Sequence, residues 1–245
     1  MSYGPVAFET PDFLVSGGMP GQGRFLRNLH FAVFWIELSC RAFCSIHIRF
    51  GSYPMTTMFK VGYLVGSLSS TSINRKLSKA LVRLAHRGFE MSEISFRELP
   101  IYSPDYDADY PPAARAFKQA IADADAILFV TPEYNRAIPG GLKNAIDWAS
   151  RPWGENSFTR KPSAVIGASI GAIGTAVAQQ NLRSVLSFCN SPQMNAPEAY
   201  IHFTPDLISD EGEVSNASTR DFLSNYMAEF HQFVARVYTA LPRGE

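Results

Sequence analysis

The sequence predicts an α/β protein in which a doubly wound sheet of five parallel strands carries helices on both faces. Short apolar runs alternate with segments of helical periodicity from about residue 59 to residue 238. Each crossover is long enough to join parallel strands, and right-handed crossovers place helices on both faces of the sheet. At 245 residues the chain is long enough for one sizeable core.

The elements follow one another in a regular order. The first predicted strand runs from Phe59 into a turn at Gly66, and the helix after it places Leu77 and Leu81 on one face and ends near Gly88. We expect the five strands at residues 59–66, 94–99, 126–130, 163–168 and between 194 and 203. We expect helices at residues 73–84, 113–122, 140–148, from about 175 to 188, and 219–238.

The composition excludes several classes of function. A formal net charge of zero offers no electrostatic attraction for nucleic acid or for an anionic membrane surface. The three cysteines form no disulfide framework and no four-ligand metal pattern, and the five histidines are scattered, so we expect no metal site. A reducing cytoplasm is the simplest location for such a chain.

The first 57 residues differ from the rest. They begin with an aperiodic Gly- and Pro-rich stretch, and charged residues interrupt the later apolar run, which is too short to span a membrane. A signal peptide would place its apolar core nearer the N-terminus, whereas a shortage of acidic residues leaves a transit peptide open. We expect residues 1–57 to be an extension outside the folded domain, or an artefact of start-site choice, and residues 58–245 to form the domain.

The segment 131–148 joins a buried strand to a helix. Pro132 and Pro139 bracket a turn that can be neither helix nor sheet interior, and Gly140 and Gly141 then open the helix. Ligands of open α/β sheets bind at such places, outside the carboxyl ends of the strands. The pattern alone is also compatible with a simple tight connection.

The turn after the first strand, residues 66–74, carries five hydroxyl side chains and one amide before a helix N-terminus. Unpaired N–H groups and a positive partial charge at that terminus suit a phosphate dianion. Ser72 can equally act as a helix cap. The sequence contains no dinucleotide-binding fingerprint and no P-loop in this turn, which argues against tightly bound NAD or ATP.

A rival interpretation starts from Ser169, which lies in a G-x-S-x-G pentapeptide between a strand and a helix, as in the nucleophile elbow of serine hydrolases. Asp206 or Asp210 and then His231 follow in the order that such hydrolases require. The pentapeptide is short, however, and His231 falls inside the last predicted helix. The segment 131–148 would have no role in a hydrolase.

Other polar and aromatic residues have two interpretations each. Glu133 and Asp147 could form a general acid/base pair, although Asp147 more simply meets a partner on its own helix or across a dimer interface. Tyr102 and Tyr106 either pack within their loop or line a pocket for flat substrates.

Residues 131–148 resemble the ring-binding loop of the NAD(P)H-dependent FMN reductase family, which includes quinone, azo-dye and chromate reductases. The family pattern T-P-E-Y-N-x-x-x-P-G-x-L-K-N-A-I-D-W is matched at every fixed position. The resemblance implies a flavodoxin-like fold with strand order 2-1-3-4-5, which brings the first, third and fourth strands together at the switch point. It also implies FMN as cofactor and NADH or NADPH as co-substrate.

The resemblance also implies which residues hold FMN. The family reads G-S-L-R-x-x-S-x-N at the phosphate turn, so Ser69 stands where arginine is usual, and the serine lacks the charge of an arginine fork. Main-chain groups of residues 133–136 and the Asn135 side chain would hold the ring, and Arg136 would guide the nicotinamide phosphate. The expected cofactor contacts are Ser67, Ser69, Ser72, Asn74, Pro132, Glu133, Tyr134, Asn135, Ser169 and Gly171.

In the chemistry that the resemblance implies, the nicotinamide delivers hydride to the flavin N5, leaves, and is replaced by a small-molecule electron acceptor. No acid or base side chain is then required. A flavodoxin-type electron carrier is the alternative, but it would be expected to carry a strongly acidic surface. Family members are dimers or tetramers, so we expect a homodimer or homotetramer with Ile146 and Trp148 buried at the contact.

Overall fold

A computed structural model of the chain describes residues 58–242, and the predicted extension at residues 1–57 lies outside the described residues. Five strands form one sheet in the order β2-β1-β3-β4-β5, and all four neighbouring pairs are parallel. This confirms the predicted strand order. The strands are β1 (Phe59–Val65), β2 (Phe89–Glu93), β3 (Ala126–Val130), β4 (Ser163–Ser169) and β5 (Tyr200–His202).

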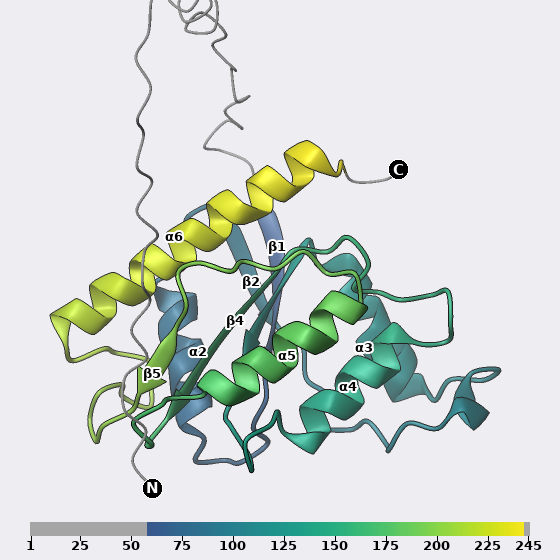
Figure 1. Cartoon of the computed structure of the whole chain (residues 1–245), viewed down its shortest axis with the longest axis horizontal. Helices are drawn as coiled ribbons and strands as arrows, with labels where there is room; N and C mark the ends of the chain where they lie inside the picture. The colour runs from purple at the N-terminus through teal and green to yellow at the C-terminus, as the bar shows by residue number, and fades with distance from the viewer. Residues whose placement is uncertain (1–57, 243–245) are drawn as a thin grey trace, which may run out of the picture. The chain divides into compact units, whose positions relative to one another are not determined.

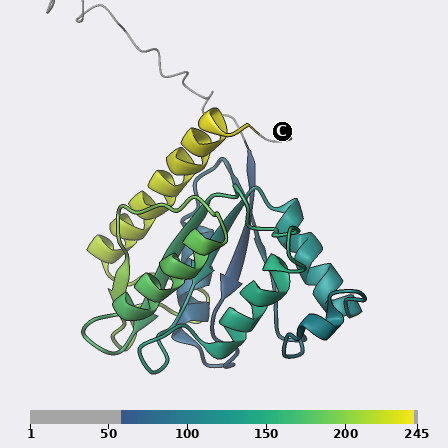
Figure 2. The ribbon, with the colours of Figure 1, turned by 45° about the vertical axis from the view of Figure 1, so that its right-hand side comes forward.

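Helices cover both faces of the sheet. Figure 1 shows α2 and α6 on one face and α3, α4 and α5 on the other, and Figure 2 gives the same arrangement from a second side. None of the helices in the described part of the chain combines the length and hydropathy that a membrane crossing needs. The helices are α2 (Ile73–Arg83), the short 3-10 helix η1 (Pro104–Tyr106), α3 (Pro112–Asp123), α4 (Gly140–Ser150), α5 (Ala176–Phe188) and α6 (Ala217–Ala240).

The central strand β3 explains why the sheet has two apolar layers. All five of its residues are buried, and they alternate between the two faces. Leu128 and Val130 belong to the core that α2 and α6 cover, whereas Ile127 and Phe129 belong to the core beneath α3, α4 and α5. A strand buried on both faces reads as a continuous apolar run, which is why the sequence located it correctly.

The predicted second strand was wrong. Residues 94–99 alternate apolar and polar side chains, as a half-buried strand does, but they form a loop. The strand that pairs with β1 is β2, an edge strand whose polar composition conceals it in the sequence. Ile94 and Phe96 are nevertheless buried, because the loop packs them into the core beneath α3 and α4.

The expectation that Ile146 and Trp148 meet a second subunit was also wrong. Both side chains are buried within the chain itself, at 1% and 0% exposure. The Trp148 Nε1–H donates to the Pro100 carbonyl at 2.7 Å. Three tyrosines pack around the Trp148 ring with centroids 5.0 to 5.4 Å away: Tyr102, Tyr106 and Tyr110. These contacts support loop packing as the role of the first two.

Candidate functional site

Three turns converge at the carboxyl edge of the sheet: 66–72 after β1, 131–139 after β3, and 169–175 after β4. The Ser67 hydroxyl lies 3.3 Å from the Tyr134 hydroxyl, which links the first turn to the second. Since β3 is paired with both β1 and β4, the second turn lies between the other two. This is the switch point of a doubly wound sheet, where such folds bind ligands.

Two glycines allow the turns to approach Thr131, the first residue after β3. A Cβ atom at Gly66 would lie 2.9 Å from the Thr131 Oγ1, and one at Gly167 would lie 2.1 Å from the Thr131 carbonyl oxygen. Real Cβ atoms do not approach so closely, so a side chain at Gly167 would force the backbones apart. The Thr131 hydroxyl itself is buried and donates to the Pro132 carbonyl at 2.8 Å.

Asn74 ties the first turn to the third. Its side-chain Nδ2 donates to the Ala168 carbonyl and its Oδ1 accepts from the Ala168 N–H, each at 2.9 Å. The side chain is 1% exposed. The Asn74 amide thus bonds both main-chain groups of Ala168, as a neighbouring strand would, and it joins the start of α2 to β4.

The second turn has an unusual backbone. Asn135 and Arg136 have φ values of 51° and 64°, in the left-handed region that side chains other than glycine rarely adopt. Tyr134 and Ala137 close the turn with two reciprocal main-chain hydrogen bonds of 3.0 Å. Strain of this kind persists where the surroundings over-determine the conformation, and it clusters at ligand sites.

Glu133 holds the second turn against α5. Its carboxylate accepts the N–H of Ala178 at 3.0 Å and pairs with Arg136 at 3.1 Å, and its side chain is only 8% exposed. Thr175, the N-cap of α5, makes no side-chain cap bond, so Glu133 caps this helix from the neighbouring turn. Asp147 instead pairs with Lys143 on its own helix at 2.7 Å, so the two acids form no catalytic pair.

Hydroxyl groups shape the first turn. Ser67 Oγ accepts the N–H of Ser69, and Ser69 Oγ accepts the N–H of Thr71, each at 3.3 Å. Ser72 caps α2 by accepting the N–H of Arg75 at 3.3 Å. Among residues 58–242, no acceptor takes up the main-chain N–H of Ser70 or Ser72. This set of hydroxyl and N–H donors at a helix N-terminus fits a phosphate group.

The third turn does not contain a hydrolase site. Ser169 Oγ accepts the Gly171 N–H at 3.1 Å. His231 lies far away, because its ring packs against Phe59 and Phe89, the first residues of β1 and β2, at centroid distances of 5.3 and 5.2 Å. The histidine is therefore at the amino edge of the sheet and the serine at the carboxyl edge, which excludes the serine hydrolase interpretation.

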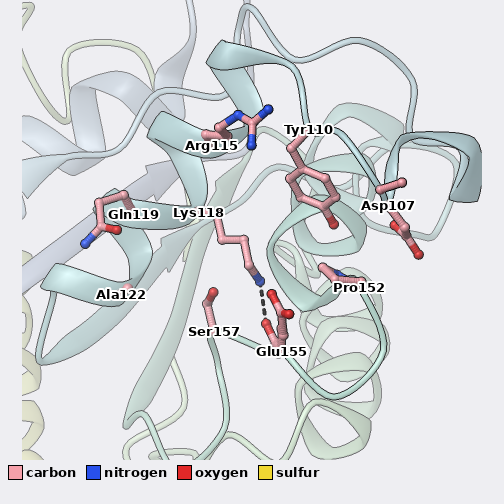
Figure 3. Close-up of a pocket in the computed structure, with 10 residues that line it drawn as sticks. Asp107, Tyr110, Arg115, Lys118, Gln119, Ala122, Pro152, Glu155 and Ser157 are labelled. Atoms are coloured by element: carbon pink, nitrogen blue, oxygen red, sulfur yellow. Dashed lines mark hydrogen bonds between the residues drawn. The ribbon is translucent and has the colours of Figure 1, made fainter.

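A separate cavity of about 440 Å³ lies between α3 and the loop after α4 (Figure 3). The Lys118 ammonium group points into it and donates to the carbonyls of Ala149 and Glu155. Burial lowers the pKa of Lys118. The cavity contains no residue of the three turns, and both of its cations already have partners: Lys118 bonds carbonyl oxygens and Arg115 pairs with Asp109. It is lined by Asp107, Ala108, Tyr110, Arg115, Lys118, Gln119, Ala122, Pro152, Glu155 and Ser157.

The structure brings the predicted site residues to one edge, but some of their side chains bind the protein itself. Asn74 bonds Ala168, Glu133 bonds α5, and Ser72 caps α2. One further neighbour of the first turn was not predicted: Arg97 donates from the loop after β2 to the Leu68 carbonyl at 2.8 Å. The absence of arginine at position 69 was the available signal, but the misplaced strand put Arg97 inside the sheet.

Residues 59–206 match the NADPH-dependent FMN reductase family. The chain belongs to this family. Membership identifies it as an oxidoreductase with FMN as cofactor and NAD(P)H as co-substrate, as the resemblance of residues 131–148 implied. It also removes the electron-carrier alternative, because family members are enzymes that use a nicotinamide donor.

Several relatives align with this reductase over nearly the whole of their own length. A 2-hydroxy-1,4-benzoquinone reductase from a Burkholderia species is 49% identical over 175 residues, which cover 71% of this chain and 96% of the relative. A quinone reductase from Pseudomonas putida is 42% identical over 181 residues, covering 74% and 97%. The flavoenzyme FerB from Paracoccus denitrificans, an NAD(P)H:(acceptor) oxidoreductase, is 41% identical in sequence, with a TM-score of 0.71 and coverage of 73% and 98%.

Proposed function

We propose that this reductase passes electrons from NAD(P)H through FMN to a quinone. The observation that carries the proposal is the convergence of three turns at the carboxyl edge of β1, β3 and β4, tied together by Asn74 and by Ser67–Tyr134. Relatives at 49% and 42% identity are named for quinone reduction. FMN, when bound, supplies the redox chemistry by accepting a hydride and releasing electrons to the acceptor.

The phosphate is assigned to the first turn. The main-chain N–H groups of Ser70 and Ser72, which have no acceptor among the described residues, supply donors together with the hydroxyls of the turn, Ser67, Ser69 and Ser72. The N-terminus of α2 adds a positive partial charge. Asn74 positions these donors through Ala168 rather than by direct contact.

The ring is assigned to the second and third turns. The main-chain N–H groups of Asn135 and Arg136 have no acceptor among the described residues, and neither does the Asn135 side-chain amide, so all are available to a polar ring edge. Pro132 is buried beneath the turn. Tyr134 and Ile170 are 50% and 78% exposed, and they offer apolar surface to flat molecules.

Anaerobic reduction tests the assignment. The purified protein should be yellow, should bleach with NADH or NADPH in a stopped-flow instrument, and should be reoxidised faster by benzoquinones than by azo dyes, metal oxyanions or free flavin. A yellow protein that neither nucleotide reduces would contradict the proposal. Faster reoxidation by one of the other acceptors would reassign the substrate class while keeping the reductase.

Substitutions of Asn135 test the ring site. Asn135→Gly removes the side chain and tolerates the left-handed backbone, whereas Asn135→Ala removes the amide and also strains the turn. We expect both variants to bind FMN more weakly, with the alanine variant the weaker of the two. Unchanged flavin affinity in both variants would remove the residue from the site.

We assign the reductase to residues 58–245 and expect a variant that begins at Met58 to retain FMN. A homodimer or homotetramer is consistent with two large apolar side chains near α4, Ile101 and Trp153, which are 80% and 78% exposed. Light scattering measures the oligomeric state. The cytoplasm suits a chain whose three cysteines form no disulfide framework.

A further inference from the structure

The first turn contains no cation of its own. Residues 66–74 include neither lysine nor arginine, and Ser69 occupies the position where the family pattern has arginine. Neutral hydroxyl and N–H donors bind a phosphate dianion less strongly than a set that includes a guanidinium group. If FMN binds at this turn, a positive charge is expected from elsewhere in the fold.

Arg97 lies at the required place. It belongs to the exposed loop after β2, and its Nη2 donates to the carbonyl oxygen of Leu68 at 2.8 Å. Leu68 directly precedes Ser69, so the guanidinium group is held against the backbone of the first turn. Of the five N–H donors of an arginine, one is used in this contact, and the others have no acceptor among residues 58–242.

Arg97 has no carboxylate partner among the described residues, whereas two basic residues near it are paired with carboxylates. Arg75, at the start of α2, is bound by both carboxylate oxygens of Glu93 at 3.0 Å. Lys76 pairs with Asp210 at 2.9 Å. No carboxylate of the described chain lies within ion-pair distance of Arg97. The two basic side chains in the first turn of α2 are therefore paired with carboxylates, whereas Arg97 keeps an unpaired charge beside the turn.

We infer that Arg97 binds the FMN phosphate, and that it supplies from the loop after β2 the charge that Ser69 does not. This rests on the proposed binding of FMN at the three turns. The fixed Leu68 contact orients the guanidinium plane, so a phosphate on the turn receives donors from Ser70, Ser72 and Arg97 together. A phosphate monoester dianion is the ligand that this combination fits.

The experiment compares FMN with riboflavin, which has the same ring but no phosphate. Flavin-free Arg97→Ala protein is titrated with each ligand, and quenching of flavin fluorescence gives the dissociation constant. Loss of a charge-assisted contact is expected to weaken FMN binding roughly ten- to hundredfold. Riboflavin binding should change less than about twofold, because a correctly folded ring site remains. Arg97→Lys should lose part of the FMN affinity, since it keeps the charge but not the fork.

Two further variants complete the design. Arg87→Ala removes an exposed arginine from the turn before β2, at the opposite edge of the sheet, and should leave both affinities unchanged. Ser69→Arg in the Arg97→Ala background should restore much of the FMN affinity, because it returns a guanidinium to the turn. Raising the salt concentration should weaken FMN binding more in the wild type than in Arg97→Ala.

The possible outcomes separate this inference from the proposal beneath it. Equal losses for FMN and riboflavin, or no loss for either, would overturn the role of Arg97 at the phosphate. A raised KM for NADPH but not for NADH, with FMN affinity unchanged, would assign Arg97 to the nucleotide phosphate and overturn the inference as well. Wild-type protein that binds neither flavin would instead refute the proposed cofactor site.

Discussion

Asn74→Ala provides a quantitative test of how the site is assembled. Asn74 is 1% exposed, and both polar atoms of its side chain bond the main chain of Ala168. The substitution removes both bonds at once and leaves the N–H and the carbonyl of Ala168 without these partners. Because Ala168 is buried at 1% exposure, water cannot readily replace the amide.

The cost follows from those two groups. A buried polar group left unsatisfied costs about 1–3 kcal/mol, so two groups predict a loss of about 2–6 kcal/mol. A domain of ordinary stability has about 5–15 kcal/mol in total, so this is a large fraction. The substitution also removes the hydrogen bonds that connect the first turn to the third, so FMN affinity should fall even under conditions where the protein remains folded.

Urea unfolding of the flavin-free protein measures the change in the free energy of unfolding. Asn225→Ala, on an exposed position of α6, is the matched control and should stay within about 0.5 kcal/mol of wild type. Asn74→Asp adds a test by pH: the protonated acid can both donate and accept, whereas the carboxylate cannot donate to Ala168. This variant should therefore lose stability from acid to neutral pH relative to wild type. An Asn74→Ala variant as stable as the control would refute the reasoning.

Two other buried groups give simpler predictions. The Tyr226 hydroxyl, fully buried, donates to the Val165 carbonyl at 2.9 Å, so Tyr226→Phe should lower the free energy of unfolding by about 1–2 kcal/mol in urea. Burial raises the pKa of the Cys189 thiol and so lowers the fraction of reactive thiolate. Alkylation of Cys189 at pH 8 should therefore be at least about tenfold slower in the folded protein than in urea. Mass spectrometry of the peptide that contains Cys189 measures the rate. Alkylation at equal rates would contradict its burial.

The three central strands, β1, β3 and β4, were located correctly because most of their residues are buried. β3 is a continuous apolar run, and proline and glycine mark the end of its turn and the start of α4. β2 was misplaced because an edge strand buries only one residue fully, and its polar residues look like a loop. The neighbouring segment 94–99 then looked like a strand, and this error hid the proximity of Arg97 to the first turn.

The contacts that connect the three turns could not be predicted from the sequence, for a different reason. Asn74 meets Ala168 across 94 residues of chain, and Glu133 meets Ala178 across 45. Both are bonds from a side chain to a main-chain group, so the partner residue carries no chemical signature. Only the packing of α2 against β4, and of the second turn against α5, determines which N–H or carbonyl lies opposite the side chain.

The polar residues of the site divide by burial, and the division has a consequence. The side chains of Asn74, Thr131 and Glu133 form hydrogen bonds with main-chain groups of the protein, so the three turns are held together without a ligand. Asn135 and Arg97 are exposed and keep donors available. Because the binding site is already ordered without its ligand, little conformational entropy is lost when the ligand binds. Substitutions of the first group should therefore lower stability and flavin affinity together, whereas substitutions of the second should lower affinity at unchanged stability.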